Sequence, residues 1–145
     1  MAEGIFGHMV RHAGLEHCFL VDSAGTHAFV NNPPDILAQA IAAAHGIDIS
    51  VSRSRQFTRT DLEQFDMILA ADKLNLRFIK SIAAGTRTEN AALLMNYYPD
   101  AEIEEVPDPY GNDIDSFKRA FNLIHNACSG LLGNLRSQPA SVHDR

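Results

Sequence analysis

Short apolar runs alternate with amphipathic helical patterns along most of this chain, and this alternation limits the possible folds more than any other feature. The clearest strand pattern is Met67–Ala71, which ends at Asp72 and precedes a helical apolar stripe. Because successive parallel strands need a crossover, usually a helix, the alternation predicts a parallel sheet covered by helices on both faces. The expected order is helix 1–13, strand 18–21, helix 33–45, a short helix at 60–63, strand 67–71, helix 73–82, strand 91–95 and helix 117–135.

Local signals mark where several helices begin and end. Gly14 and Gly46 each follow a helical stripe, where glycine favours the left-handed conformation that closes a helix. Pro33–Asp35 suits a first helical turn, and Thr60–Glu63 has the pattern of a capping box. The polar segments that follow the strands should meet at the carboxyl edge of the sheet, where such sheets bind ligands. These segments are Asp22–Ser23, Asp72 and the loop after Met95.

The pattern opens on a helix rather than on a strand. Ile5, Phe6, Met9, Val10 and Ala13 form one apolar stripe from the first turn onward. The alternation would place a strand ahead of this helix, and the residues given contain none. We therefore expect the sheet to lack its first strand.

Composition excludes several classes of protein. The 145 residues suit one domain, expected at 1–136, followed by a disordered tail at 137–145. A net charge of −6 argues against nucleic-acid binding, and Arg53, Arg55 and Arg59 are interpreted as a solvated turn. No apolar stretch approaches the roughly 20 residues that span a bilayer. With no signal peptide and only two cysteines, we expect a cytoplasmic protein without membrane association.

The segment Glu105–Gly111 carries the strongest chemical signal. Pro107 and Pro109 fix the backbone on either side of Asp108 and disfavour helix there. A carboxylate on a stiff loop, with Tyr110 two residues later, suits a positioned general acid. Taken alone, such a segment is more often an ordinary Pro-Asp turn.

Four segments, in order and at similar spacing, resemble the low-molecular-weight protein tyrosine phosphatases. They are Met1–Gly4, Val21–Thr26, Arg53–Asp72 and Val106–Tyr110, and the resemblance extends to about Leu135. It implies a three-layer α/β fold with a short parallel sheet flanked by helices, here without its central first strand. It also implies hydrolysis of a phosphotyrosine-containing protein or a small aryl phosphate, with no metal or other cofactor.

The same resemblance implies roles for individual residues. Asp108 matches the general acid that protonates the leaving phenolate and then activates water. Tyr110 and Phe29 match aromatic side chains that bind the substrate ring. Ser23 matches a serine that supports the phosphate loop, and Asp72 belongs to a motif that shapes the edge of the site. Two positions depart from the family pattern: Gly111 replaces a second aromatic, and Ser52 or a neighbour replaces a histidine.

The phosphate loop itself is the main departure. In the family a Cys, five residues, an Arg and a Ser or Thr cradle the phosphate, and this loop precedes a Met-Ala-Glu-Gly segment, which here is residues 1–4. The helix that follows attracts phosphate and lowers the pKa of the thiol. Six residues after Cys18 stands Ala24, and six after Cys128 stands Asn134, so neither cysteine has the Arg. We expect both to be buried thiols, and the 145 residues to hold no nucleophile and to be inactive.

Loss of the first strand should also affect folding. The family sheet order is 2-1-3-4, so the absent strand would lie between Phe19–Asp22 and Met67–Ala71. Several orphaned backbone groups at about 1–3 kcal/mol each rival the stability of a whole domain. We expect poor folding, a strand-swapped oligomer, or direct pairing of the two flanking strands.

Three alternatives remain open at this point. The first is a non-catalytic domain that binds phosphorylated ligands, and the second is an interaction domain with no phosphate role. The third is an arsenate reductase, which shares the fold but needs additional redox cysteines. His8 and His12, four residues apart, have the spacing of a metal pair, but no third ligand is evident and we expect no metal.

Overall fold

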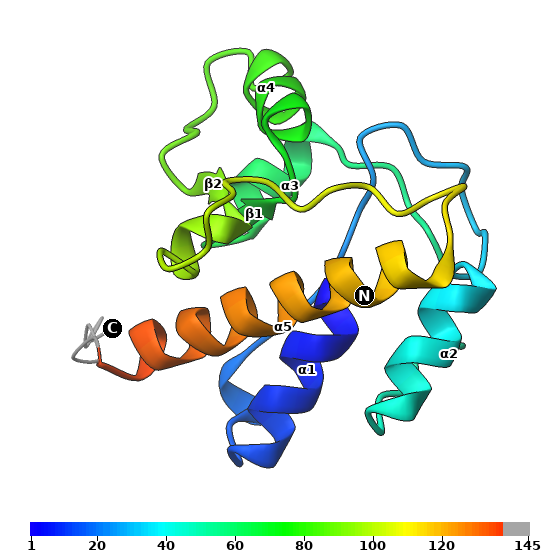
Figure 1. The fold of residues 1–145 in the computed structure, drawn as a ribbon. Helices are drawn as coiled ribbons and strands as arrows, with labels where there is room; N and C mark the ends of the chain where they lie inside the picture. The colour runs from blue at the N-terminus through cyan, green and yellow to red at the C-terminus, as the bar shows by residue number, and fades with distance from the viewer. Residues whose placement is uncertain (138–145) are drawn as a thin grey trace.

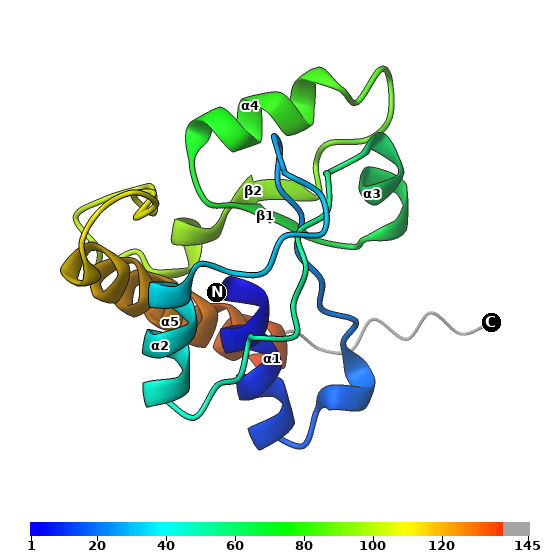
Figure 2. The same ribbon diagram turned by 90° about the vertical axis from the view of Figure 1, so that its right-hand side faces the viewer.

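Two short parallel strands lie at the centre of the fold, in a computed structural model that describes residues 1–137 (Figure 1). β1 (Ile68–Ala70) pairs with β2 (Ala91–Leu93) in the register Ile68↔Ala91. α3 (Arg59–Gln64) precedes β1, and α4 (Lys73–Ser81) connects the strands and packs against them. α1 (Ala2–His12), α2 (Ile36–Ala44) and α5 (Ile114–Ser137) lie on the opposite side (Figure 2). The predicted α/β class with a short parallel sheet flanked by helices is confirmed.

The predicted helix ends at Gly14 and Gly46 are confirmed. Gly14 has φ 68°, and its N–H and that of the next residue donate to carbonyls of the last turn of α1 at 2.9 and 2.8 Å. Gly46 has φ 74° and closes α2 with the same pair of bonds. This is the Schellman arrangement, in which glycine adopts the left-handed conformation at low cost. At the start of α2, the Asp35 carboxylate accepts the N–H of Leu37 at 2.8 Å.

Several predicted element boundaries are wrong. α2 begins at Ile36 with Asp35 as its N-cap, so Pro33 and Pro34 precede the helix rather than form its first turn. α3 is capped by Thr58 rather than Thr60, because the Asp61 carboxylate accepts the N–H of Thr58 at 2.8 Å and completes the capping box there. The strand expected at 91–95 ends at Leu93, and a 3₁₀ turn, η2 (Leu94–Tyr97), follows. Leu94 and Met95 are both buried in the larger apolar cluster, beside α5.

The strand expected at 18–21 is absent. Cys18 ends a 3₁₀ turn, η1 (Glu16–Cys18), and the following residues carry no strand assignment, with Leu20 85% exposed. A strand needs a ladder partner, and among the described residues β1 pairs with β2 alone. Direct pairing of the flanking strands therefore does not occur. Farther along, Gly25 forms an isolated parallel bridge with Gln56.

Apolar side chains form two separate clusters, one on each face of the sheet. The larger lies among α1, α2, α5 and η2, and the smaller lies among the sheet, α3 and α4. Leu69 packs against the larger cluster and Ile68 against the smaller, as the alternation of side chains along a strand requires. The side of α5 that faces the larger cluster carries these buried residues: Phe117, Phe121, Ile124, Cys128 and Leu131.

The described part of the chain ends with α5. α5 includes Ser137, the first residue of the expected tail, and residues 138–145 lie outside those the structure describes. Within residues 1–137, no helix has both the length and the apolar character that crossing a bilayer requires.

Candidate functional site

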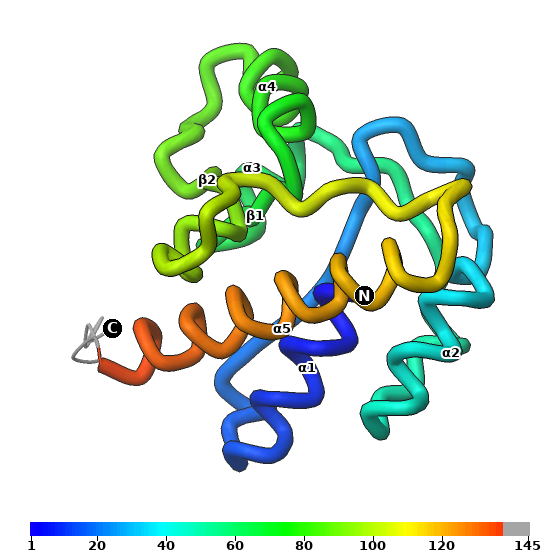
Figure 3. Tube along the Cα trace, viewed as in Figure 1, coloured from blue at the N-terminus to red at the C-terminus, as the bar shows by residue number. Residues whose placement is uncertain are grey.

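The segment Glu104–Tyr110, called here the acid loop, lies between η2 and α5 and passes the junction of β1 and α4 (yellow in Figure 3). The N–H of Val106 donates to the carbonyl of Ala71, directly after β1, at 2.9 Å, and Val106 is buried. Asp108 follows two residues later and is exposed. Its carboxylate accepts the N–H of Tyr110 at 3.0 Å, which forms an Asx turn across Pro109. The loop thus presents a carboxylate in a locally fixed orientation.

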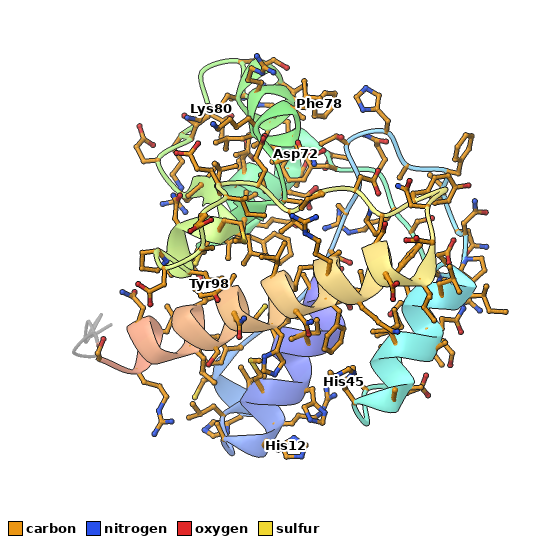
Figure 4. The ribbon with its side chains drawn as sticks, viewed as in Figure 1. His12, His45, Asp72, Phe78, Lys80 and Tyr98 are labelled. Carbon is orange, nitrogen blue, oxygen red and sulfur yellow. The ribbon has the colours of Figure 1, made fainter. Side chains whose placement is uncertain are left out.

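The turn between β1 and α4 is a second element of this edge. The Asp72 carboxylate accepts the N–H of Asn75 at 2.6 Å and caps α4 (Figure 4). The Asn75 side-chain oxygen in turn accepts the hydroxyl of Thr26 at 2.8 Å. The turn therefore contacts the loop after residue 21 on one side and the acid loop on the other. The structure brings together the Asp72 turn, the acid loop and Thr26, whereas Asp22 and Ser23, also predicted for this edge, contact Arg55 and Glu3 instead.

Arg55 joins two more segments of the same region. Its guanidinium lies 2.9 Å from the Asp22 carboxylate and 3.0 Å from that of Asp61. Hydrogen bonding to Asp61 raises the pKa of Arg55, although partial burial opposes the shift. Burial acts to raise the pKa of Asp61, but hydrogen bonds from Arg55 and the Thr58 backbone outweigh it and lower that pKa. The interpretation of Arg55 as part of a solvated turn is wrong, because its guanidinium pairs with Asp61 and also with Asp22, which lies 33 residues away along the chain.

Ser23 borders a pocket at the start of α1. The pocket has a volume of about 170 Å³, and its polar lining consists of Glu3, Ser23, Asn32, Ser52, Arg53 and Ser54. The Ser23 hydroxyl donates to the Glu3 carboxylate at 2.5 Å. The Arg53 guanidinium donates to the carbonyls of Ser50 and Ser52 at 2.8 and 2.7 Å. The pocket therefore combines hydroxyl groups and one cation with a carboxylate.

The two aromatic residues predicted to bind substrate are both solvent-facing. Phe29 is 82% exposed and Tyr110 is 78% exposed. The backbone carbonyl of Phe29 accepts the hydroxyl of Ser54, which ties its loop to the segment before α3. Both rings are thus free of the core and accessible to an external ligand.

The two cysteines lie in different environments. Cys128 is 1% exposed, and burial raises its pKa to about 12, so the nucleophilic thiolate is strongly disfavoured at neutral pH. Cys18 is exposed, so its predicted burial was wrong; the strand that would have enclosed it does not form. Neither position offers an activated thiol paired with an arginine six residues on.

His12 and His45 lie apart from this edge, whereas the ring of His27 lies beside it, 5.1 Å from that of Phe78 in α4. Figure 4 places His12 and His45 at the end of the molecule opposite Asp72. The rings of His8 and His12 lie 4.0 Å apart between centroids, and burial together with His12 lowers the pKa of His8. No group of three or more His, Cys, Asp or Glu side chains within residues 1–137 has the arrangement of a metal site.

Sequence reasoning missed the contacts of Lys73 as well as those of Arg55. Lys73 contacts Glu104 and Glu105 of the acid loop, about thirty residues away along the chain. Spacing within one segment cannot reveal such a contact. The only sign of this contact in the sequence is that Glu104 and Glu105 stand just before the Pro-Asp-Pro motif.

Comparisons with known proteins agree on one family. The family model described as low molecular weight phosphotyrosine protein phosphatase matches residues 1–141. The chain is 34% identical over 141 residues to the low molecular weight protein-tyrosine-phosphatase YfkJ of Bacillus subtilis, covering 95% of this chain and 88% of that protein. It is 35% identical over 136 residues to the low molecular weight phosphotyrosine protein phosphatase of Homo sapiens, covering 91% and 84%. The crystal structure of YfkJ superposes with a TM-score of 0.88 at 33% identity, covering 94% of this chain and 87% of that one.

Proposed function

The chain belongs to the low molecular weight phosphotyrosine protein phosphatase family, and from that membership we propose that Asp108 is the general acid of an aryl-phosphate site. The observation that carries this proposal is the Asx turn from Asp108 to Tyr110, which holds the carboxylate on a loop anchored to the end of β1. A phenolate leaving group needs a proton as its bond to phosphorus breaks, and a positioned carboxylic acid supplies it.

The substrate we propose is a phosphotyrosine-containing protein or a small aryl phosphate. Tyr110 and Phe29, both exposed, would flank the aromatic ring of the substrate. Ser23 and Asp72 would support the site rather than react, since the side chain of each is engaged with a neighbouring residue.

We also propose that these 145 residues alone do not turn over an aryl phosphate. The thiol of Cys128 is buried with a raised pKa, and the position six residues after Cys18 is Ala24. The test is release of nitrophenolate from p-nitrophenyl phosphate by the purified chain. We expect no release above that of buffer, and turnover by the chain that Asp108→Ala abolishes would overturn this part of the proposal.

A fusion tests the role of Asp108 itself. A strand followed by the family's Cys-x5-Arg-Ser/Thr loop is placed directly ahead of Met1. We expect turnover to appear, and Asp108→Asn to lower kcat by about 10²–10⁴-fold, the usual contribution of general acid catalysis. Asp100→Asn, which removes an exposed carboxylate from the preceding loop, is the matched control. An active fusion that tolerates Asp108→Asn would rule out the assignment.

Binding without catalysis is a second candidate, favoured by the pocket at the start of α1. Its hydroxyl groups, Arg53 and the free N–H groups of the first helical turn suit a phosphate group. The negative charge of the Glu3 carboxylate, which already accepts the Ser23 hydroxyl, opposes phosphate binding there. Titration with phosphotyrosine, followed by NMR, tests this candidate. Binding in the pocket requires chemical-shift changes at Ala2–Gly4, and their absence would rule it out.

A further inference from the structure

Three consecutive residues attach the acid loop to the turn between β1 and α4. The Glu105 carboxylate accepts the backbone N–H of Lys73 at 2.6 Å. The Glu104 carboxylate pairs with the Lys73 ammonium group, and the N–H of Val106 donates to the carbonyl of Ala71. These contacts immediately precede Pro107 and Asp108. They set where the proposed general acid lies relative to the sheet.

The contact of Glu105 differs in kind from that of Glu104. Lys73 is the first residue of α4, and its N–H has no acceptor within the helix. A carboxylate that accepts this N–H forms a charge-assisted hydrogen bond and also lies at the positive end of the helix dipole. By contrast, the Glu104 side chain is 75% exposed in its ion pair, and exposed pairs of this kind contribute little.

We propose that Glu105 is a positioning residue for Asp108, a role that rests on the proposed function of Asp108. The Asx turn orients the Asp108 carboxylate only within its own loop. The contacts of Glu105 and Val106 fix that loop against the β1–α4 turn. Pro107 limits the backbone rotation between Glu105 and Asp108, so the anchor and the acid move together. Without Glu105, the loop keeps the Val106 backbone bond and the exposed Glu104–Lys73 ion pair, but it loses the hydrogen bond to the N-terminus of α4.

The test uses the 145-residue chain and needs no turnover. Glu105→Ala removes the acceptor, Glu105→Gln keeps an oxygen acceptor without the charge, and Glu102→Gln removes a charge from the same connection as a control. Amide hydrogen exchange at Tyr110 and the Lys73 amide chemical shift are followed by NMR. We expect exchange at Tyr110 to be about tenfold faster in Glu105→Ala, since a hydrogen bond to a charged group is lost. Glu105→Gln, which keeps the acceptor but not the charge, should restore part of the protection.

Two results would overturn the proposal. One is exchange at Tyr110 in Glu105→Ala equal to that in the parent chain. The other is equal exchange in Glu105→Gln and Glu105→Ala, which would assign the effect to charge alone. If Glu105→Ala fails to fold, Glu105→Asp takes its place, because the shorter side chain draws the acceptor away from Lys73.

Kinetics of the fusion described above separate this proposal from the proposed function. In an active fusion, Glu105→Ala should lower kcat about tenfold with KM nearly unchanged, because the acid acts on the leaving group rather than on binding. Tolerance of Asp108→Asn would refute the proposed function alone and leave the exchange result standing. Sensitivity to Asp108→Asn with indifference to Glu105→Ala would refute the positioning role alone.

Discussion

At the scale of single residues, charged side chains hold together loops that the short sheet does not. Arg55 contacts Asp22 and Asp61, and Glu105 contacts the N-terminus of α4. Asp61 is 5% exposed and also completes the capping box of α3, so one carboxylate serves an ion pair and a helix cap. A substitution of Asp61 should therefore affect both the ion pair with Arg55 and the cap of α3.

Asp61→Ala should lower the free energy of unfolding by about 2 kcal/mol, because it removes a helix cap and a charge-assisted hydrogen bond. Asp61→Asn keeps an oxygen acceptor for the N–H of Thr58 and should cost less. Asp66→Asn, at an exposed carboxylate just after α3, is the control. Urea unfolding at pH 7 measures the differences.

The difference in the free energy of unfolding between the parent chain and Asp61→Asn should depend on pH. The pKa of Asp61 is lowered in the folded chain, so its ionisation stabilises the fold above the ordinary aspartate pKa. That contribution is lost as the pH falls below about 4. The difference between the parent chain and Asp61→Asn should shrink over this range, and a difference that grows on acidification would contradict the assignment.

At the scale of elements, the sequence predicted helices better than strands. Gly14, Gly46 and Asp35 act through bonds within their own helix ends, so local residues suffice to place them. Cys18–Val21 has a strand-like pattern, but a strand exists only where a partner lies beside it. For the same reason the sequence singled out the stiff Pro-Asp-Pro segment around Asp108, but not the contacts that Arg55 and Glu105 make across the fold.

Two glycines of α5 give a prediction at this scale. A Cβ at Gly130 would lie 1.9 Å from the carbonyl oxygen of Tyr97, whereas a Cβ at Gly133 would meet nothing within 4 Å. Gly130→Ala should cost about 2–3 kcal/mol, because the helix and η2 must separate. Gly133→Ala should stabilise the chain by about 0.5–1 kcal/mol through lower unfolded-state entropy. Equal urea midpoints for the two variants would show that α5 and η2 do not pack this closely.

At the scale of the whole molecule, the sheet is short and lies between two apolar clusters. One side of β1 pairs with β2, and within residues 1–137 no strand pairs with its other side. An open strand edge is a template for pairing with another chain. Leu20 is 85% exposed, and its apolar side chain adds to the tendency of the chain to associate.

We therefore expect the 145-residue chain to associate as its concentration rises, as a strand-swapped oligomer would. Leu20→Lys should shift the equilibrium toward monomer, since it replaces an exposed apolar side chain with a charged one. Ile36→Lys, at a similarly exposed apolar residue in the first turn of α2, should change it less. Sedimentation velocity measures the populations. A monomer at every concentration would contradict the expectation.

The separation of the two apolar clusters also has a consequence for cooperativity. Residues 57–93 enclose the smaller cluster, and α1, α2 and α5 enclose the larger, so the chain contains two potential units of sub-global unfolding. The acid loop bridges them, because it is bonded to Ala71 and Lys73 of the first unit and continues into α5 of the second. A ligand that immobilises this loop would couple the two units. Its binding should then slow amide exchange in β1 and β2 as well as beside Asp108.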